Sequence, residues 1–196
     1  ASPTCCWSAC PASTTSAIMD TNLELIASAR VLPLLDFAAD ALLKTRSMSG
    51  RVALITGGSR GIGKMIAKGF IAYGAPVYIS SRKADVCEQT ARELSAGGGF
   101  CEALPIDAST KEGIAALATA FAAREKKLDI LVNNAGAAWL AEFDAFPEKG
   151  WDKVVDLNMK TPFFLTQALA PQLRAAATRE RPAKVINIAS IDGITI

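Results

Sequence analysis

The stretch that decides the fold reads Arg51-Val-Ala-Leu-Ile-Thr-Gly-Gly-Ser-Arg-Gly-Ile-Gly63. Its first six residues are nearly all apolar, which is typical of a strand buried on both faces of a parallel sheet. Glycines follow at the spacing Gly-x-x-x-Gly-x-Gly, and apolar residues then recur at helical spacing from Met65 to Ile71. Because glycines in a strand-to-helix turn let the backbone approach a phosphate, the stretch predicts a strand, a phosphate-binding turn and a helix. A purely structural turn is the alternative.

Strands and helices continue to alternate after this stretch. Five apolar runs separated by helical segments predict an α/β fold with a doubly wound parallel sheet, the Rossmann fold. The longest helical segment contains Pro162 and Pro171, so we expect a kink or break within it. After the first strand, the expected strands are 75–80, 100–105, 128–132 and 183–189, and the expected helices are 84–96, 111–126 and 148–177.

The composition excludes several classes of function. Apolar residues make up 51% and charged residues 20% of the 196 residues, which fits one globular domain. The formal net charge is only +2 and no uncharged apolar run of about 18 residues occurs, so neither nucleic acid nor a membrane is expected as a partner. The absence of histidine excludes Ser-His-Asp and Cys-His catalysis and His-ligated metals. Three of the five cysteines crowd the first ten residues, so we expect no metal site.

The residues after the second expected strand indicate which dinucleotide the turn would bind. In such folds an acidic residue about 20 positions beyond the glycines binds the ribose 2′-hydroxyl of NAD, whereas an arginine there suits the 2′-phosphate of NADP. Here the sequence reads Ser80-Ser-Arg-Lys83, with no carboxylate before Asp85, and Arg60 in the turn adds another cation. One charge-assisted contact to the phosphate would favour NADP by about 10- to 150-fold. We therefore predict NADP(H) as the cofactor, with Arg82 on a merely solvated loop as the alternative.

Four motifs resemble those of the short-chain dehydrogenase/reductase (SDR) family in order and spacing: Thr56-Gly-Gly-Ser-Arg-Gly-Ile-Gly63, Asn133-Asn-Ala-Gly136, Asp156-Leu-Asn158 and Asn187-Ile-Ala-Ser190. The resemblance covers about residues 50–196. Within the family, residues 78–83 and 185–195 look most like the β-ketoacyl reductases of the rhamnolipid pathway. The resemblance implies an NADPH-dependent oxidoreductase that reduces a carbonyl, such as that of a 3-oxoacyl thioester, to a hydroxyl.

The resemblance also implies roles for individual residues. Arg82 would bind the 2′-phosphate and Asp107 the adenine, Asn158 would support the proton relay, and Ser190 would bind the substrate carbonyl. A helix asparagine whose polar groups are satisfied locally is the alternative for Asn158, and a simple turn residue is the alternative for Gly136. The residues along the pyrophosphate and the rest of the cofactor would be Gly57, Ser59, Arg60, Gly61, Ile62, Gly63, Asn133, Ala135 and Gly136.

The proton donor of the family is a Tyr-x-x-x-Lys, which the resemblance places about a dozen residues after Ser190 and so beyond Ile196. The tyrosines present are Tyr73 and Tyr78, and we interpret Tyr78-x-x-x-Arg82 as a coincidence because arginine cannot replace a tunable lysine. We therefore expect a chain that is incomplete at its C-terminal side and nearly inactive by itself. The full-length form is expected to be a homo-oligomer.

Three parts are expected along the chain: a disordered tail over 1–22, a helical extension over 23–49 with a break at Pro33, and a truncated NADP-binding domain over 50–196. No secretory or mitochondrial targeting pattern occurs at the start, so a cytoplasmic location is expected, with a plastid-type transit segment as the weaker alternative. Two functions stay open: a reductase of small carbonyl compounds and a non-catalytic NADP-binding module. A Tyr-x-x-x-Lys motif after Ile196 in the coding sequence would favour the reductase.

Overall fold

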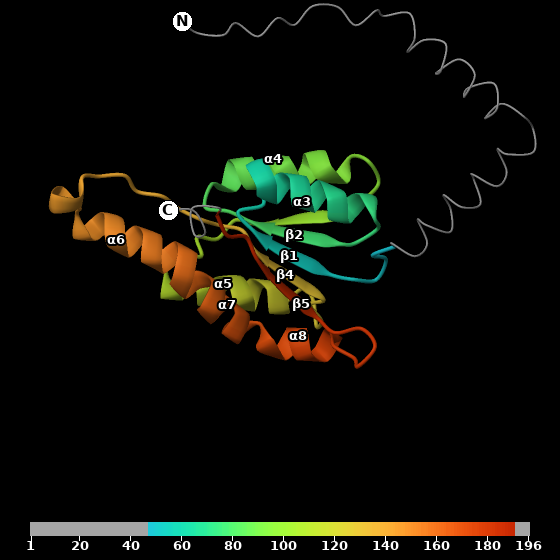
Figure 1. Cartoon of the computed structure of the whole chain (residues 1–196). Helices are drawn as coiled ribbons and strands as arrows, with labels where there is room; N and C mark the ends of the chain where they lie inside the picture. Colours follow the sequence, from blue (N-terminus) through green and yellow to red (C-terminus); the bar gives the residue numbers. More distant parts are fainter. Residues whose placement is uncertain (1–46, 191–196) are drawn as a thin grey trace, which may run out of the picture. The chain divides into compact units, whose positions relative to one another are not determined.

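The computed structural model describes residues 47–190 of the chain. Its centre is a five-stranded sheet with the order β3-β2-β1-β4-β5, in which every neighbouring pair of strands is parallel. This order confirms the doubly wound α/β fold predicted from the sequence (Figure 1). The strands are β1 (Ala53–Thr56), β2 (Val77–Ser80), β3 (Cys101–Leu104), β4 (Ile130–Asn133) and β5 (Lys184–Asn187).

Helices cover both faces of the sheet (Figure 1). The helices α3 (Gly61–Ala72) and α4 (Ala84–Ser95) lie on one face. The opposite face carries α5 (Lys111–Ala122), α7 (Thr161–Ala168) and α8 (Ala170–Ala176). Both sets of helices follow the segments expected from the spacing of apolar residues.

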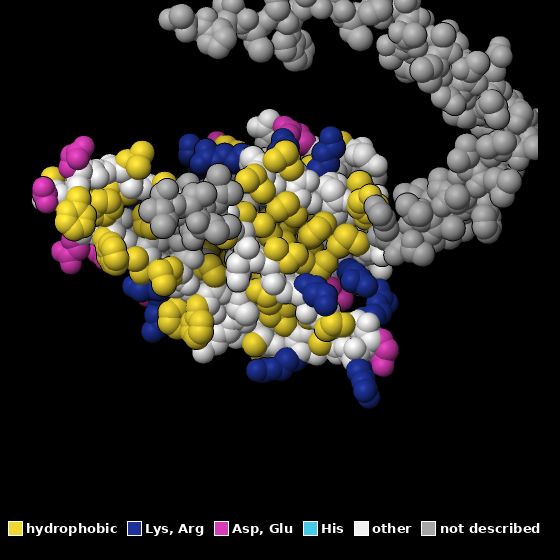
Figure 2. Space-filling model, in the orientation of Figure 1, with side chains coloured by type: hydrophobic (Ala, Val, Ile, Leu, Met, Phe, Trp, Pro, Cys, Tyr) yellow, Lys and Arg dark blue, Asp and Glu magenta, His cyan; other side chains and the backbone are white. Residues whose placement is uncertain are grey.

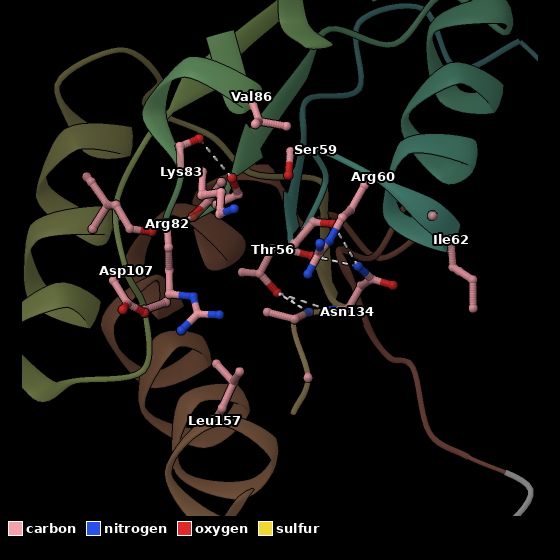
Figure 3. Close-up of a pocket in the computed structure, with 18 residues that line it drawn as sticks. Thr56, Ser59, Arg60, Ile62, Arg82, Lys83, Val86, Asp107, Asn134 and Leu157 are labelled. Atoms are coloured by element: carbon pink, nitrogen blue, oxygen red, sulfur yellow. Dashed lines mark hydrogen bonds between the residues drawn. The ribbon is translucent and has the colours of Figure 1, made fainter. Parts of the chain in front are cut away.

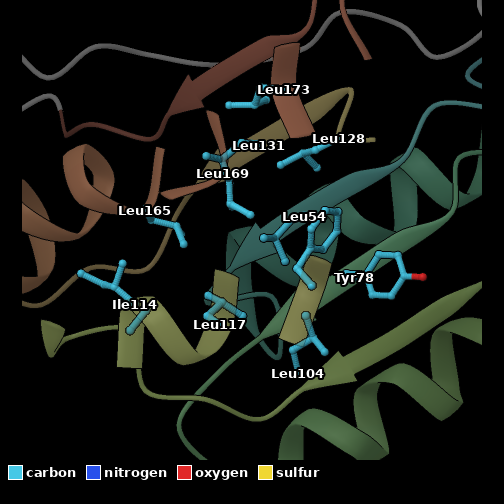
Figure 4. Packing of buried hydrophobic residues seen from close by; sticks show 12 residues of the cluster. Leu54, Tyr78, Leu104, Ile114, Leu117, Leu128, Leu131, Leu165, Leu169 and Leu173 are labelled. Carbon is cyan, nitrogen blue, oxygen red and sulfur yellow. The ribbon is translucent and has the colours of Figure 1, made fainter. Parts of the chain in front are cut away.

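Each face of the sheet has its own apolar core. Successive residues of a strand point to opposite faces, so Leu54 of β1 packs with residues of α5, α7 and α8, as Figure 4 shows. Its neighbours Ala53 and Ile55 belong to the second core, together with Ala67 of α3 and Cys87 of α4. All four residues of β1 are buried, which explains why this strand has almost no polar side chains.

The helical segment expected over 148–177 is divided, as its two prolines predict. It consists of α6 (Glu148–Val155), a π-helical turn η2 (Asp156–Lys160), α7 and α8. Pro162 and Pro171 lie in the first turns of α7 and α8, where proline is common. The π turn itself is not predicted by the sequence pattern; in it the N–H of Thr161 reaches the carbonyl of Asp156, five residues back.

The predicted tail over 1–22 and most of the predicted helical extension over 23–49 lie outside the described residues. The end of that extension, Ser47 to Ser49, is not helical and leads into a turn, where the Met48 N–H donates to the Tyr73 carbonyl at 2.8 Å. Between residues 47 and 190, no helix has the length and apolar character needed to cross a membrane.

Two thiols of the described part belong to the core between α4 and the sheet. Cys87 and Cys101 are free and buried, and burial, with a smaller contribution from Cys87, raises the pKa of Cys101 to about 12. A thiol that stays protonated is a poor nucleophile and a poor metal ligand. Within residues 47–190, no group of three or more His, Cys, Asp and Glu side chains could hold a metal ion. These two cysteines therefore serve packing.

Candidate functional site

A cavity of about 520 Å³ opens at the carboxyl ends of β1, β2 and β4. In the strand order β3-β2-β1-β4-β5, β2 and β3 lie on one side of β1, whereas β4 and β5 lie on its other side. The direction of winding therefore changes between β1 and β4. Ligands of doubly wound folds bind at this switch point. Figure 3 shows the side chains around the cavity, which come from the glycine turn and the start of α3, the end of β2, the start of α4, the loops after β3 and β4, and η2.

The glycine turn between β1 and α3 has no room for side chains where its backbone segments meet. Gly57 has a φ of +66°, a left-handed conformation that favours glycine. A Cβ at Gly63 would lie 2.4 Å from the Gly57 carbonyl oxygen and 2.5 Å from Nδ2 of Asn134. Arg60 is the N-cap residue of α3 and makes no side-chain hydrogen bond to the helix start. The first N–H groups of α3 are thus available to an anion.

Hydrogen bonds connect the loop after β4 to the glycine turn. The Thr56 hydroxyl accepts from the backbone N–H groups of Asn134 at 3.1 Å and Ala135 at 3.0 Å. The side-chain amide of Asn134 donates to the carbonyls of Thr56 at 2.9 Å and Gly57 at 3.2 Å. Since Gly57 and Ala135 both line the cavity, these bonds fix two of its walls relative to each other.

Three cationic side chains line the cavity: Arg60, Arg82 and Lys83 (Figure 3). None of the three forms an ion pair within residues 47–190. Asp107 is the single carboxylate among the lining residues, and its Oδ1 accepts from the Ser109 N–H at 3.0 Å. The excess of positive charge at the end of β2 suits an anionic group and not a ribose hydroxyl.

Asn133, Asn158 and Ser190 are not among the lining residues. Asn133 ends β4, and its side chain donates to Oδ1 of Asn187 in β5 at 2.9 Å. Asn158 lies in η2 and binds both backbone groups of Ala137, with 2.8 Å from the Ala137 N–H to its Oδ1 and 2.9 Å from its Nδ2 to the Ala137 carbonyl. Ser190 follows the end of β5 at the carboxyl edge of the sheet. Asn133 therefore connects two strands, and Asn158 holds the loop after β4.

Tyr78 belongs to the core and not to this site. It is buried, and its hydroxyl donates to Oε1 of Glu125 at 2.9 Å. Burial, and then the Glu125 carboxylate, raise the pKa of Tyr78. A tyrosine that serves as a general acid and base near neutral pH needs a lowered pKa and access to the substrate. The geometry agrees with the interpretation of Tyr78-x-x-x-Arg82 as a coincidence.

The cavity brings together most of the residues that the resemblance assigns to the cofactor. Gly63 and Asn133 are the two that do not line it. Thr56 and Asn134 were missed as site residues, although Asn134 lies inside the Asn-Asn-Ala-Gly motif that could have revealed it. The assigned residues that line the cavity are Gly57, Ser59, Arg60, Gly61, Ile62, Arg82, Asp107, Ala135 and Gly136. The further lining residues are Thr56, Ser80, Ser81, Lys83, Val86, Ile106, Ala108, Asn134 and Leu157.

The fold and the glycine turn at its switch point define the class: this is a Rossmann-type protein. The particular family follows from comparison with known proteins, because the model of the short chain dehydrogenase family matches residues 51–195. The chain belongs to the short-chain dehydrogenase family of oxidoreductases, which confirms the resemblance seen in the four motifs.

Individual relatives have the same fold with different cofactors. The chain is 50% identical over 149 residues to the rhamnolipids biosynthesis 3-oxoacyl-[acyl-carrier-protein] reductase of Pseudomonas aeruginosa, an alignment that covers 76% of this chain and 58% of that protein. A structure of the Pseudomonas aeruginosa RhlG/NADP active-site complex superposes with a TM-score of 0.73 at 50% identity and the same coverage. A 7α-hydroxysteroid dehydrogenase complexed with NADH superposes with a TM-score of 0.69 at 31% identity, over 76% of this chain and 57% of that one.

The chain spans only part of the length of these relatives, 58% of the Pseudomonas reductase and 57% of the steroid dehydrogenase. One of these solved structures contains NADP and the other NADH, so the shared fold does not decide between the two cofactors. The choice between NADP and NAD in this chain therefore rests on the charged residues at the end of β2.

Proposed function

We propose that the chain carries the NADP(H)-binding part of an oxidoreductase that reduces the carbonyl of a small molecule, a 3-oxoacyl thioester, to a hydroxyl. The observation that carries this proposal is the group of cations Arg60, Arg82 and Lys83 at the cavity, without a carboxylate at the end of β2. A 2′-phosphate beside these side chains gains charge-assisted hydrogen bonds that NAD cannot make. The substrate class is supported by the likeness to the Pseudomonas reductase that is named for it.

The residues around the cavity fit NADPH in three ways. The positive φ of Gly57 and the crowded position of Gly63 leave backbone, not side chains, against the pyrophosphate. Arg82 would bind the 2′-phosphate, and Arg60 adds a second positive charge to the same cavity. Asp107, in the loop after β3, would accept a hydrogen bond from the adenine amino group. These assignments follow the family resemblance, and the cavity supports them.

When bound, NADPH supplies the hydride for the reduction. The hydroxyl of Ser190 would donate a hydrogen bond to the substrate carbonyl and so orient it. Asn158 would support the proton relay and hold the loop at Ala137. We expect the proton donor in a Tyr-x-x-x-Lys that these 196 residues do not contain. If the protein as the cell makes it binds NADPH without this segment, the non-catalytic NADP-binding module is the function.

Arg82→Ala is expected to weaken NADPH binding about 10- to 150-fold and to leave NADH binding nearly unchanged, because only NADPH carries the 2′-phosphate. The dissociation constants of both nucleotides are to be measured by fluorescence titration of the full-length protein. Arg92→Ala is the matched control, since Arg92 lies on the exposed side of α4 beside Glu88 and does not line the cavity. An equal loss of affinity for both nucleotides would refute the 2′-phosphate assignment.

The homo-oligomer and the cytoplasmic location are further parts of this proposal. An apolar stripe formed by Trp151 of α6, Met159 of η2 and Phe163 of α7 supports the oligomer, because these residues are 64%, 68% and 64% exposed. Figure 2 shows hydrophobic side chains gathered over α6 and α7. Met159→Glu combined with Phe163→Glu should convert the full-length oligomer to a monomer, as measured by light scattering. An unchanged mass would exclude this stripe as the interface.

A further inference from the structure

The loop after β4 passes from the cofactor cavity to the outer helix α6. Its first residues, from Asn134 to Gly136, line the cavity, and the Thr56 hydroxyl holds the N–H groups of Asn134 and Ala135. After them the chain reaches Trp139 and then the short 3-10 helix η1 (Phe143–Ala145). The position of the cavity wall at Gly136 therefore depends on what fixes the loop beyond that point.

The indole of Trp139 is packed against a glycine of α6. A Cβ added to Gly150 would lie 2.7 Å from both Cγ and Cδ1 of the indole, closer than such atoms approach in proteins. On the same helix, Nζ of Lys153 lies 5.2 Å from the centroid of the Trp139 ring, within the range of a cation–π interaction. Gly150 and Lys153 are three residues apart and share one helix face. This face receives the indole.

A second contact from the next turns of the same helix acts on the same loop. The side-chain amide of Asn158 binds both the N–H and the carbonyl of Ala137, two residues before Trp139. The loop is thus held twice within three residues, once by a backbone clasp from η2 and once by an aromatic contact with α6. Gly136, which lines the cavity, directly precedes the clasp, so the Asn158 clasp and the Trp139 contact together hold the chain that leaves this wall.

We propose that Trp139 is a positioning residue of the cofactor site, which sets the place of the Ala135–Gly136 backbone by packing on Gly150. The inference rests on the proposed function, since it concerns the site that would hold NADPH. Trp139 does not line the cavity, so its effect reaches the nucleotide through the loop backbone. That backbone lies at the end of β4, away from the 2′-phosphate side formed by Arg82.

Trp139→Ala should therefore raise the dissociation constants of NADPH and NADH by the same factor, about five- to tenfold. This differs from Arg82→Ala, which should discriminate between the two nucleotides. Trp139→Phe keeps an aromatic ring against Gly150 and should restore most of the affinity. Leu140→Ala is the matched control: Leu140 is the next residue of the loop, its side chain is 96% exposed, and its removal should leave both constants unchanged.

Gly150→Ala tests the same contact from the helix side. The added methyl group would displace the indole and so weaken the binding of both nucleotides, as Trp139→Ala should. When Gly150→Ala is combined with Trp139→Ala, the added methyl group has room. The nucleotide affinity of this double variant should therefore be no lower than that of Trp139→Ala alone. A purely structural role of Trp139 would lower the thermal midpoint and leave the nucleotide affinities unchanged, and that result would overturn the inference.

The outcomes separate the two proposals. If the wild-type protein binds NADPH and the folded Trp139 variants bind it equally well, only the role of Trp139 is wrong. If the wild-type protein binds neither nucleotide, the proposed function fails and this inference fails with it. Should Trp139→Ala not fold, Gly150→Ala and Trp139→Phe decide the question, since each retains a ring at position 139.

Discussion

Gly63→Ala is expected to weaken NADPH binding about 100-fold. The added Cβ would lie 2.4 Å from the Gly57 carbonyl oxygen. Because this oxygen belongs to the backbone, it cannot rotate away as the end of a flexible side chain could. The start of α3 must therefore move away from β1, and Asn134, whose Nδ2 lies 2.5 Å from the same Cβ, must move too. The turn that faces the pyrophosphate and the wall after β4 would change together.

A second glycine in α3 provides the control for this variant. Gly69→Ala adds the same methyl group to the same helix, but nothing lies within 4 Å of the new Cβ except the helix's own backbone. It should leave NADPH affinity unchanged and stabilise the protein by about 0.5–1 kcal/mol, because alanine favours a helix over glycine. Fluorescence titration and urea unfolding measure the two quantities. Normal NADPH affinity in Gly63→Ala would show that the turn does not hold the pyrophosphate.

Ser190→Ala in the full-length protein is expected to lower kcat about 10²–10³-fold, as removal of one hydrogen-bond donor to a developing oxyanion does. The affinity for NADPH should stay within a factor of about two, because Ser190 does not line the cavity that would hold the nucleotide. Steady-state kinetics with a 3-oxoacyl thioester, combined with NADPH titration of the same variant, measures both. Unchanged turnover would remove Ser190 from the substrate site, and a parallel loss of NADPH affinity would assign it a structural role.

Most elements with strong apolar periodicity could be predicted from the sequence to within one or two residues. The helix expected over 111–126 is an exception, because α5 ends four residues earlier, at Ala122. β4, expected over 128–132, runs from Ile130 to Asn133, and the difference arises because Leu128 is buried outside the hydrogen-bonded ladder. Pro162 and Pro171 indicated a kink or break in the long helical segment, and they lie in the first turns of α7 and α8. Local chemistry was sufficient for these features.

The features that were missed depend on contacts between distant segments. The π turn η2 coincides with a tertiary contact, in which the Thr161 hydroxyl lies 2.6 Å from the carbonyl of Ala108 in the loop after β3. The packing of Trp139 on Gly150 joins residues with no periodic relation in the sequence. The Asn-Asn-Ala-Gly motif includes Asn134, but composition and spacing do not reveal the hydrogen bonds that Thr56 and Asn134 form with backbone groups. For such residues only the assembled fold shows the role.

The π turn constrains how this segment can change in length. A π turn contains one residue more than an α-helical turn, so deletion of one residue from η2 would convert it to an α-helical turn and leave α7 and α8 in nearly the same orientation relative to α6. Deletion of one residue from the first turn of α7 would instead rotate the rest of that helix by about 100°. Leu165, Leu169 and Leu173, all buried, could then not keep their places in the core while Gly150 kept its contact with Trp139. Single-residue gaps among homologous sequences should therefore fall within the five residues of η2 and not within α7.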